Sequence, residues 1–380
     1  MAEDLLDAWN ARLDALRGWN PLLHLTALCA FNANTDLVRR ATAGDLADLL
    51  RVIPEGLRAE VAAALDAGRG TEVTVESGVE AALADRGPFT SHVGGQAALA
   101  AEVLTGLGAR SILLLGGVRG AQHFVFEFGT PHGDRRLILA GQPPVVGADP
   151  DLTQAAIDSG LDAAFLSGFH RMAPDVARGC ARHFLKLRTG MVPVHLELTA
   201  LRPASRDAIR GLVALSDSLG GSEQEMRDLL EERGAFPLFF ARLRTFAKDN
   251  LLARVHMHLE GVQVAVVEAS REEERRALLV ASKAAAETAR TGTLRPSLRD
   301  GVALRAEDLA RFRGVVDALG GDPETGFVGE DGVVVPSPRV ESPVRVVGLG
   351  DVLSSMAFFA RARHLKGRAP HGLDDDRGRP

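Results

Sequence analysis

Short apolar runs and helical patterns alternate along most of this chain of 380 residues. Five runs are closed by glycine, asparagine or a charged residue, as buried strands are: LTALCAF from Leu25, SILLLGG from Ser111, DAAFLSGF from Asp162, VPVHLEL from Val192 and LARVHMHLEG from Leu252. Helical spacing marks residues 96–108, 173–190 and 206–221, each closing on a glycine suited to a helix C-terminus. This alternation predicts an α/β fold with a mostly parallel sheet and helices on both faces.

Two segments depart from that pattern and predict a small inserted unit. TEVTVES from Thr71 and HFVFEFGTPHGDRRLILAG from His123 alternate apolar and polar residues, as half-exposed antiparallel strands do. We therefore expect a small discontinuous lid from residues 40–92 and 122–142, and a large domain from residues 1–39, 93–121 and 143–365. Residues 366–380 are charged and rich in glycine and proline, which indicates a disordered tail.

The charge and cysteine content narrow the function classes. A net charge of -6 argues against nucleic-acid and anionic-membrane partners. Cys29 and Cys180 lie far apart without metal-ligand spacing, which indicates reduced thiols. The N-terminal segment lacks a signal-peptide pattern, and no run reaches the roughly 18 apolar residues that a membrane span needs. We expect a cytoplasmic protein.

The segment VVGLGDVLSSMAF from Val346 carries the clearest chemistry. Glycines just before a helix let successive backbone amides converge on an anion, helped by the helix dipole. Asp351 would lie beside that anion and could accept a hydroxyl proton as the oxygen attacks phosphorus. The alternative is that Asp351 only caps the helix, and this motif alone leaves both interpretations open. The chain has no Walker A sequence, so a P-loop kinase is not supported.

Six segments in one order, from about residue 24 to residue 362, carry a family resemblance. They are FNANTD, SHVGGQAALAA, HFVFEF, VPVHLEL, RVHMHLEGVQVAV and VGLGDVLSSMAF. Together they resemble the ADP-dependent sugar kinases, the glucokinase and phosphofructokinase family of the ribokinase-like superfamily. The resemblance implies a ribokinase-like three-layer α/β/α sandwich whose large domain binds the nucleotide and whose small α/β lid covers the site.

The same resemblance implies roles at the strand ends and the glycine loop. Asp351 would be the general base, and the amides around Gly348 and Gly350 would form the anion hole. Glu197 of the H-x-E motif and Glu225 of an N-x-x-E motif would hold Mg²⁺, largely through water. A surface salt bridge is the alternative for Glu197. Ser222 stands where the family has asparagine, so helix capping competes with a metal role there.

For the acceptor sugar, the resemblance implies Asn34, Asp36, Gly95 and Gln96, and an ordinary turn is the alternative for NANTD. Short polar groups of this kind suit a ligand rich in hydroxyls.

From the lid, His123 would contact the acceptor and Arg135 the transferred phosphate, although Arg136 adjoins it and either could point inward. Glu72 would favour glucose by repelling a sugar phosphate, with Glu76 as its rival.

The expected activity is transfer of the β-phosphoryl group of ADP to a hexose, most simply glucose, giving AMP and glucose 6-phosphate. A 6-phosphofructokinase, a kinase of another sugar and a non-catalytic sugar- or nucleotide-binding protein on the same fold are the alternatives. We expect small-molecule partners, no nucleic acid or membrane, and a monomer or dimer. The chain departs from the family in a trimmed lid and in Arg345, which stands where a small residue is usual.

Overall fold

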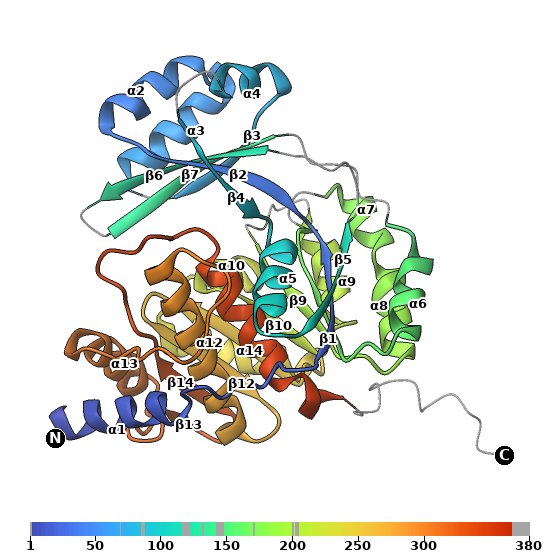
Figure 1. The fold of residues 1–380 in the computed structure, drawn as a ribbon, viewed down its shortest axis with the longest axis vertical. Helices are drawn as coiled ribbons and strands as arrows, with labels where there is room; N and C mark the ends of the chain where they lie inside the picture. Colours follow the sequence, from blue (N-terminus) through green and yellow to red (C-terminus); the bar gives the residue numbers. More distant parts are fainter. Residues whose placement is uncertain are drawn as a thin grey trace.

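The computed structural model describes residues 2–68, 70–84, 88–115, 122–130, 133–141, 148–169, 172–199, 201 and 205–366. Within them, Figure 1 shows a large unit and a small unit, each built on its own sheet. The expected tail of residues 366–380 lies outside the described residues except for Lys366.

The large unit contains a nine-stranded sheet in the order β13-β14-β12-β11-β10-β9-β8-β1-β5. Its strands are β1 (Thr26–Phe31), β5 (Arg110–Leu115), β8 (Ala163–Leu166), β9 (Val194–Glu197), β10 (Ser218–Ser222), β11 (Arg254–Leu259), β12 (Val262–Val267), β13 (Phe327–Val328) and β14 (Gly332–Pro336). The pairs from β5 to β11 are parallel and those from β11 to β13 are antiparallel. The expectation of a mostly parallel central sheet is confirmed.

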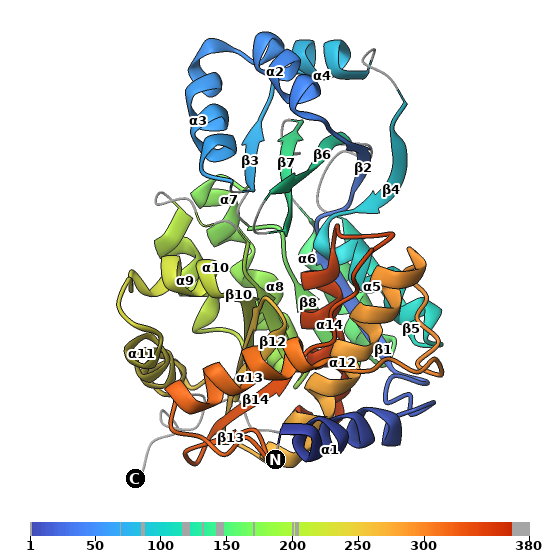
Figure 2. The ribbon, with the colours of Figure 1, turned by 90° about the vertical axis from the view of Figure 1, so that its left-hand side faces the viewer.

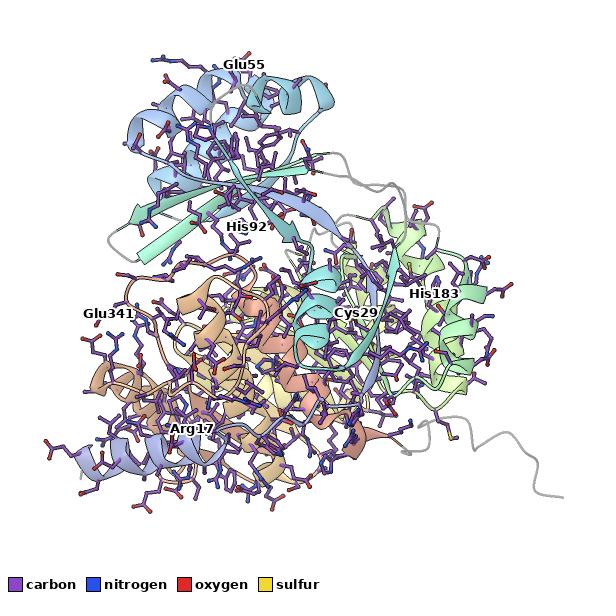
Figure 3. All side chains as sticks on the ribbon, in the orientation of Figure 1. Arg17, Cys29, Glu55, His92, His183 and Glu341 are labelled. Atoms are coloured by element: carbon purple, nitrogen blue, oxygen red, sulfur yellow. The ribbon has the colours of Figure 1, made fainter. Side chains whose placement is uncertain are left out.

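Helices cover both faces of this sheet. One layer holds α5 (Gln96–Gly106), α12 (Arg271–Thr291) and α14 (Leu349–Leu365), and the other holds α6 (Pro150–Asp158), α7 (Pro174–Gly179), α8 (Ala181–Thr189), α9 (Arg206–Val213), α10 (Glu223–Leu230) and α11 (Phe236–Asp249). Helices α1 (Ala2–Ala15) and α13 (Ala306–Ala318) pack together near β14. Both cysteines are buried, and Figure 3 shows Cys29 within this unit. The three layers enclose one continuous apolar core.

The small unit contains a five-stranded sheet in the order β3-β7-β6-β2-β4. Its elements are β2 (Asn34–Arg40), α2 (Ala43–Val52), α3 (Glu55–Asp66), β3 (Thr71–Thr74), α4 (Ser77–Ala84), β4 (Thr90–Gly94), β6 (Gln122–Thr130) and β7 (Gly133–Ala140). Phe124, Phe126, Leu137 and Leu139 form its core with the helices. Figures 1 and 2 show the helices on the outer face, so the other face of the sheet is turned toward the large unit.

Three sequence-based expectations differ from the structure. The pattern of TEVTVES predicts an antiparallel strand, but β3 pairs with β7 in parallel. We expected the lid to begin at residue 40 and the large domain to resume at residue 93, but β2 and β4 both belong to the small sheet, because they pair with each other over residues 34–38 and 90–94. The helix expected over residues 206–221 ends at Val213, and its last residues form the central strand β10. Gly220 and Gly221 therefore belong to a strand and do not end a helix. The side chains beside them in the candidate active site explain why.

Candidate active site

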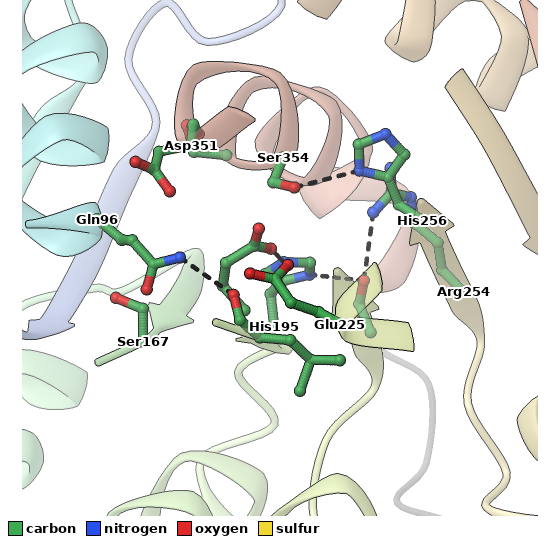
Figure 4. A network of polar contacts seen from close by, with 12 residues as sticks. Gln96, Ser167, His195, Glu225, Arg254, His256, Asp351 and Ser354 are labelled. Carbon is green, nitrogen blue, oxygen red and sulfur yellow. Dashed lines mark hydrogen bonds and ion pairs between the residues drawn. The ribbon is translucent and has the colours of Figure 1, made fainter. Parts of the chain in front are cut away.

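The carboxyl ends of three neighbouring strands meet the start of α14 at one edge of the large sheet. Strand β9 ends at Glu197, β10 leads into Glu225 on α10, and β11 carries His256 and His258. Figure 4 shows Asp351, Gln96 and Glu225 around this edge. Such an edge is the usual place for a ligand in an open α/β sheet.

Gly348, not Asp351, is the N-cap of α14. Its backbone is left-handed, with a φ of 79°, and no side chain caps the helix. A Cβ on Gly348 would lie 2.6 Å from Leu99 Cδ1, and a Cβ on Gly350 would lie 2.8 Å from His258 Nε2. Asp351 therefore lies in the first helical turn and is not the N-cap residue. The two glycines add no side chain of their own beside the backbone amides at the helix start.

Glu197 is buried in a polar setting and is not part of a surface salt bridge. Its Oε2 lies 2.9 Å from His195 Nε2, and His195 Nδ1 lies 2.8 Å from Ser218 Oγ. Burial, followed by the charges of Asp351 and Glu225, raises the pKa of Glu197 well above its usual range. The charges of Asp351 and Glu225 thus both oppose ionisation of Glu197.

The position of Glu197 explains the glycines of β10. A Cβ on Gly220 would lie 2.2 Å from Glu197 Oε2 and 2.6 Å from His195 Nε2. A Cβ on Gly221 would lie 3.1 Å from Glu225 Oε2. Only glycine at position 220 leaves room for the Glu197 carboxylate, and a side chain at position 221 would crowd Glu225, so the pair serves the strand and does not end a helix.

Glu225 takes part in a capping box. Its Oε2 accepts a 2.6 Å hydrogen bond from the backbone N–H of Ser222, and Ser222 Oγ accepts one from the Glu225 N–H. The capping alternative for Ser222 is therefore realised. The capping box uses one carboxylate oxygen of Glu225. The charge of Glu225 still contributes to the raised pKa of Glu197.

The residues expected to bind the acceptor gather where the two units meet. Asn34 donates a 2.5 Å hydrogen bond from Nδ2 to Asp36 Oδ1. Burial raises the pKa of Asp36 to about 6, against the opposing charge of Arg345. A Cβ on Gly95 would lie 2.8 Å from Asn34 Oδ1. Gln96 donates from Nε2 to the Leu198 carbonyl at 3.1 Å, and its Oε1 is buried with no hydrogen-bond partner among the described residues.

The register of the small sheet decides which lid residues face the site. Asp36 is opposite His123, with 3.7 Å between Asp36 Oδ1 and His123 Nδ1. Glu72 pairs with Ile138, two residues from Arg136 on β7, so Glu72 and Arg136 share the inner face. The charge of Arg136 acts on both Asp36 and His258.

Arg135 lies on the other face of β7. It pairs with Phe128, which belongs to the core under the helices. Opposed residues share a face, so Arg135 is directed away from the site and Arg136 takes the inward position. Glu76, the rival of Glu72, comes after the end of β3 at Thr74.

Two further site residues were given no role from the sequence. His258 is half-buried, and its Nδ1 is a buried atom with no hydrogen-bond partner among the described residues. Burial, followed by the charge of Arg136, lowers the pKa of His258 to about 4, so the imidazole is neutral at pH 7. Arg345 is also buried, beside Asp36 and Asp351. The H-x-H pattern and the unusual arginine were the signals available in the sequence.

The fold is that of the ribokinase-like proteins: a three-layer α/β/α body, a small second sheet over its strand ends, and a glycine loop opening a late helix. The model of the ADP-specific phosphofructokinase/glucokinase conserved region matches residues 123–360. The chain belongs to this family. Among the described residues, no helix is both long and apolar enough to pass through a membrane.

Individual relatives agree with the family. An ADP-dependent glucose/glucosamine kinase of Pyrococcus abyssi is 29% identical over 226 residues, which are 52% of this chain and 49% of the relative. An ADP-specific phosphofructokinase of Methanosarcina acetivorans is 26% identical over 282 residues, 61% of this chain and 57% of the relative. The chain thus spans about half the length of these curated relatives.

A solved structure shares the fold over nearly the whole chain. It is an ADP-dependent kinase complex with fructose-6-phosphate and ADPβS, with a TM-score of 0.71 and 19% identity, covering 97% of this chain and 99% of that one.

Proposed function

We propose that this protein is an Mg²⁺-dependent kinase that transfers the β-phosphoryl group of ADP to a hydroxyl of a hexose. One observation carries the proposal: Asp351, in the first turn of α14, acts electrostatically on the Glu197 carboxyl, as Glu225 does, and it also acts on Asp36. A proton acceptor between an acidic cluster and a hydroxyl-binding group is the arrangement that phosphoryl transfer to a sugar needs.

The residues present fit a divalent cation held through water. The charges of Asp351 and Glu225 both oppose ionisation of Glu197, and a cation near these carboxyl groups would favour the ionised form. No group of three histidine, cysteine, aspartate or glutamate side chains in the described parts of the chain could hold a metal ion directly. Mg²⁺ keeps much of its hydration shell, so a few carboxylates suffice. When bound, the ion would neutralise phosphate charge during transfer.

The protein's own groups account for the transfer. Asp351 accepts the proton of the acceptor hydroxyl while the hydroxyl oxygen bonds to the β-phosphorus of ADP. The bond between that phosphorus and the AMP oxygen breaks, and AMP leaves. The backbone amides at the start of α14 stabilise charge on the transferred group. Neutral His258 lies against Gly350 and can donate a hydrogen bond from its protonated ring nitrogen to a nucleotide phosphate. Arg136 approaches from the small unit, which we propose closes as a lid and excludes water.

Glucose is the acceptor that we propose. Its hydroxyls suit the Asn34–Asp36 pair and the unpartnered Oε1 of Gln96. Glu72 lies on the inner face of the small sheet, where its carboxylate would repel an acceptor phosphate. One curated relative is named a glucose/glucosamine kinase and the other a phosphofructokinase, so the choice rests on Glu72 and the polar groups.

The test combines purified protein, Mg²⁺, glucose or fructose 6-phosphate, and ADP or ATP, with direct measurement of AMP, ADP and sugar phosphate. We expect AMP and glucose 6-phosphate from ADP and glucose alone. Turnover of fructose 6-phosphate would instead make the protein a phosphofructokinase. Thermal stabilisation by sugar and nucleotide without turnover of any pair would favour a binding protein.

A further inference from the structure

Arg345 joins the glycine loop of α14 to the end of strand β4. Its side chain is only 7% exposed. Its Nε donates a 2.8 Å hydrogen bond to the Val347 carbonyl, and its Nη2 donates a 3.2 Å hydrogen bond to the Val93 carbonyl. One guanidinium group therefore contacts two backbone segments that are 252 residues apart in the chain.

Both segments lead directly into the proposed site. Val347 precedes Gly348, the N-cap of α14. Val93 precedes Gly94, where a Cβ would lie 2.2 Å from Asp36 Oδ1 and 2.3 Å from Asn34 Nδ2. The end of β4 is thus in close contact with the pair proposed to bind the sugar. A shift of either backbone segment would change the distance between the acceptor hydroxyl and Asp351.

The charges around Arg345 argue against a pocket for an anionic ligand. Asp36, Asp351 and Glu127 all act on its guanidinium, and each favours the charged form. An additional anion would have to approach against these three carboxylates. The positive charge is therefore used within the protein.

We propose that Arg345 is a positioning residue that fixes the glycine loop and the acceptor-binding end of β4 in one geometry. The inference rests on the proposed function for its kinetic consequence, although the bridge itself can be tested without activity. A planar guanidinium presents donors in a fixed fork, whereas a lysine ammonium is a single centre on a flexible stem. Lysine would keep the charge and lose the two-point contact.

The kinetic experiment compares wild type with Arg345→Lys, Arg345→Ala and the control Arg339→Lys. Arg339 lies in the same connection before α14, is more exposed, and pairs with Glu260 at 3.4 Å. We expect both Arg345 variants to lose about 10-fold to 100-fold in kcat, with a higher KM for the sugar and little change in the KM for ADP. Added guanidinium should restore part of the Arg345→Ala rate, and methylammonium of equal charge should not.

Amide hydrogen exchange supplies the readout that is independent of turnover. In Arg345→Lys, amides around residues 93–95 and 347–350 should exchange faster than in wild type, and Arg339→Lys should leave both segments unchanged. If the wild-type protein turns over no sugar, the proposed function fails. The hydrogen-exchange result alone then tests whether Arg345 holds the two backbone segments together. Unchanged exchange in both segments, or wild-type kcat in Arg345→Ala, would overturn the inference.

Discussion

The Glu197 carboxylate occupies the space where Gly220 would otherwise carry a side chain, since a Cβ on Gly220 would lie 2.2 Å from Glu197 Oε2. A carboxylate at the end of β9 thereby sets the residue type on the neighbouring strand β10. This steric relationship and the site geometry lead to four predictions.

Gly220→Ala should displace Glu197 and His195, because the new methyl group overlaps both side chains. We expect a loss of about 1–3 kcal/mol in the free energy of unfolding, together with most of the activity. Gly211→Ala is the matched control, since nothing lies within 4 Å of a Cβ at that helical position. It should stabilise the protein by up to about 1 kcal/mol. Denaturant unfolding of both variants tests this, and equal effects would contradict it.

Asp351→Asn should lower kcat by about 100-fold or more, because the proton acceptor is removed. It should not destabilise the fold, since the negative charge that opposes ionisation of Glu197 is removed with it. Initial rates and thermal melts measure the two effects. Asp207→Asn, at an exposed carboxylate on α9, serves as the control. A normal rate in the Asp351 variant would refute its assignment as the base.

Asp36→Asn should change the pH dependence of stability. Burial raises the pKa of Asp36 from 3.8 to about 6, so the folded state keeps this proton to a higher pH than the unfolded state. Wild-type stability attributable to this group is therefore highest below about pH 4 and falls as the pH rises to about 6. The variant should match wild type near pH 4 and exceed it above pH 6, by up to about 3 kcal/mol. Denaturant unfolding across this range checks the sign, and a constant difference would contradict it.

Arg136→Gln and Arg135→Gln form a matched pair on adjacent residues. Arg136 shares the inner face of β7 with Ile138, whereas Arg135 pairs with Phe128 on the helix-covered face. We expect the Arg136 variant to lose about 100-fold or more in kcat, because the substitution removes the positive charge that stabilises the transferred phosphoryl group. The kcat of the Arg135 variant should stay near the wild-type value. Measurements of kcat for both variants test this prediction. A larger loss of kcat in the Arg135 variant would show that the opposite face of β7 is turned toward the site.

The chain's local patterns were sufficient for most of the large sheet. Buried parallel strands such as β1 and β8 are apolar on both faces, and a short uninterrupted apolar run reports this directly. The same patterns failed at Ser218–Ser222, since small residues at the centre of a sheet look like a helix end. Residues 218–222 form a strand beside the side chains of β9. Those side chains lie more than 20 residues earlier in the chain, so a local sequence pattern does not include them.

What the sequence determined by itself was the fold class, the family and the placing of Asp351 beside a glycine loop, because strand alternation and loop glycines are local properties. Only the tertiary structure decided that Gly348 caps α14, that Arg136 and not Arg135 faces inward, and that Arg345 spans two segments. These outcomes depend on strand register and on contacts between residues far apart in the chain, where a shift of one residue turns a side chain to the opposite face.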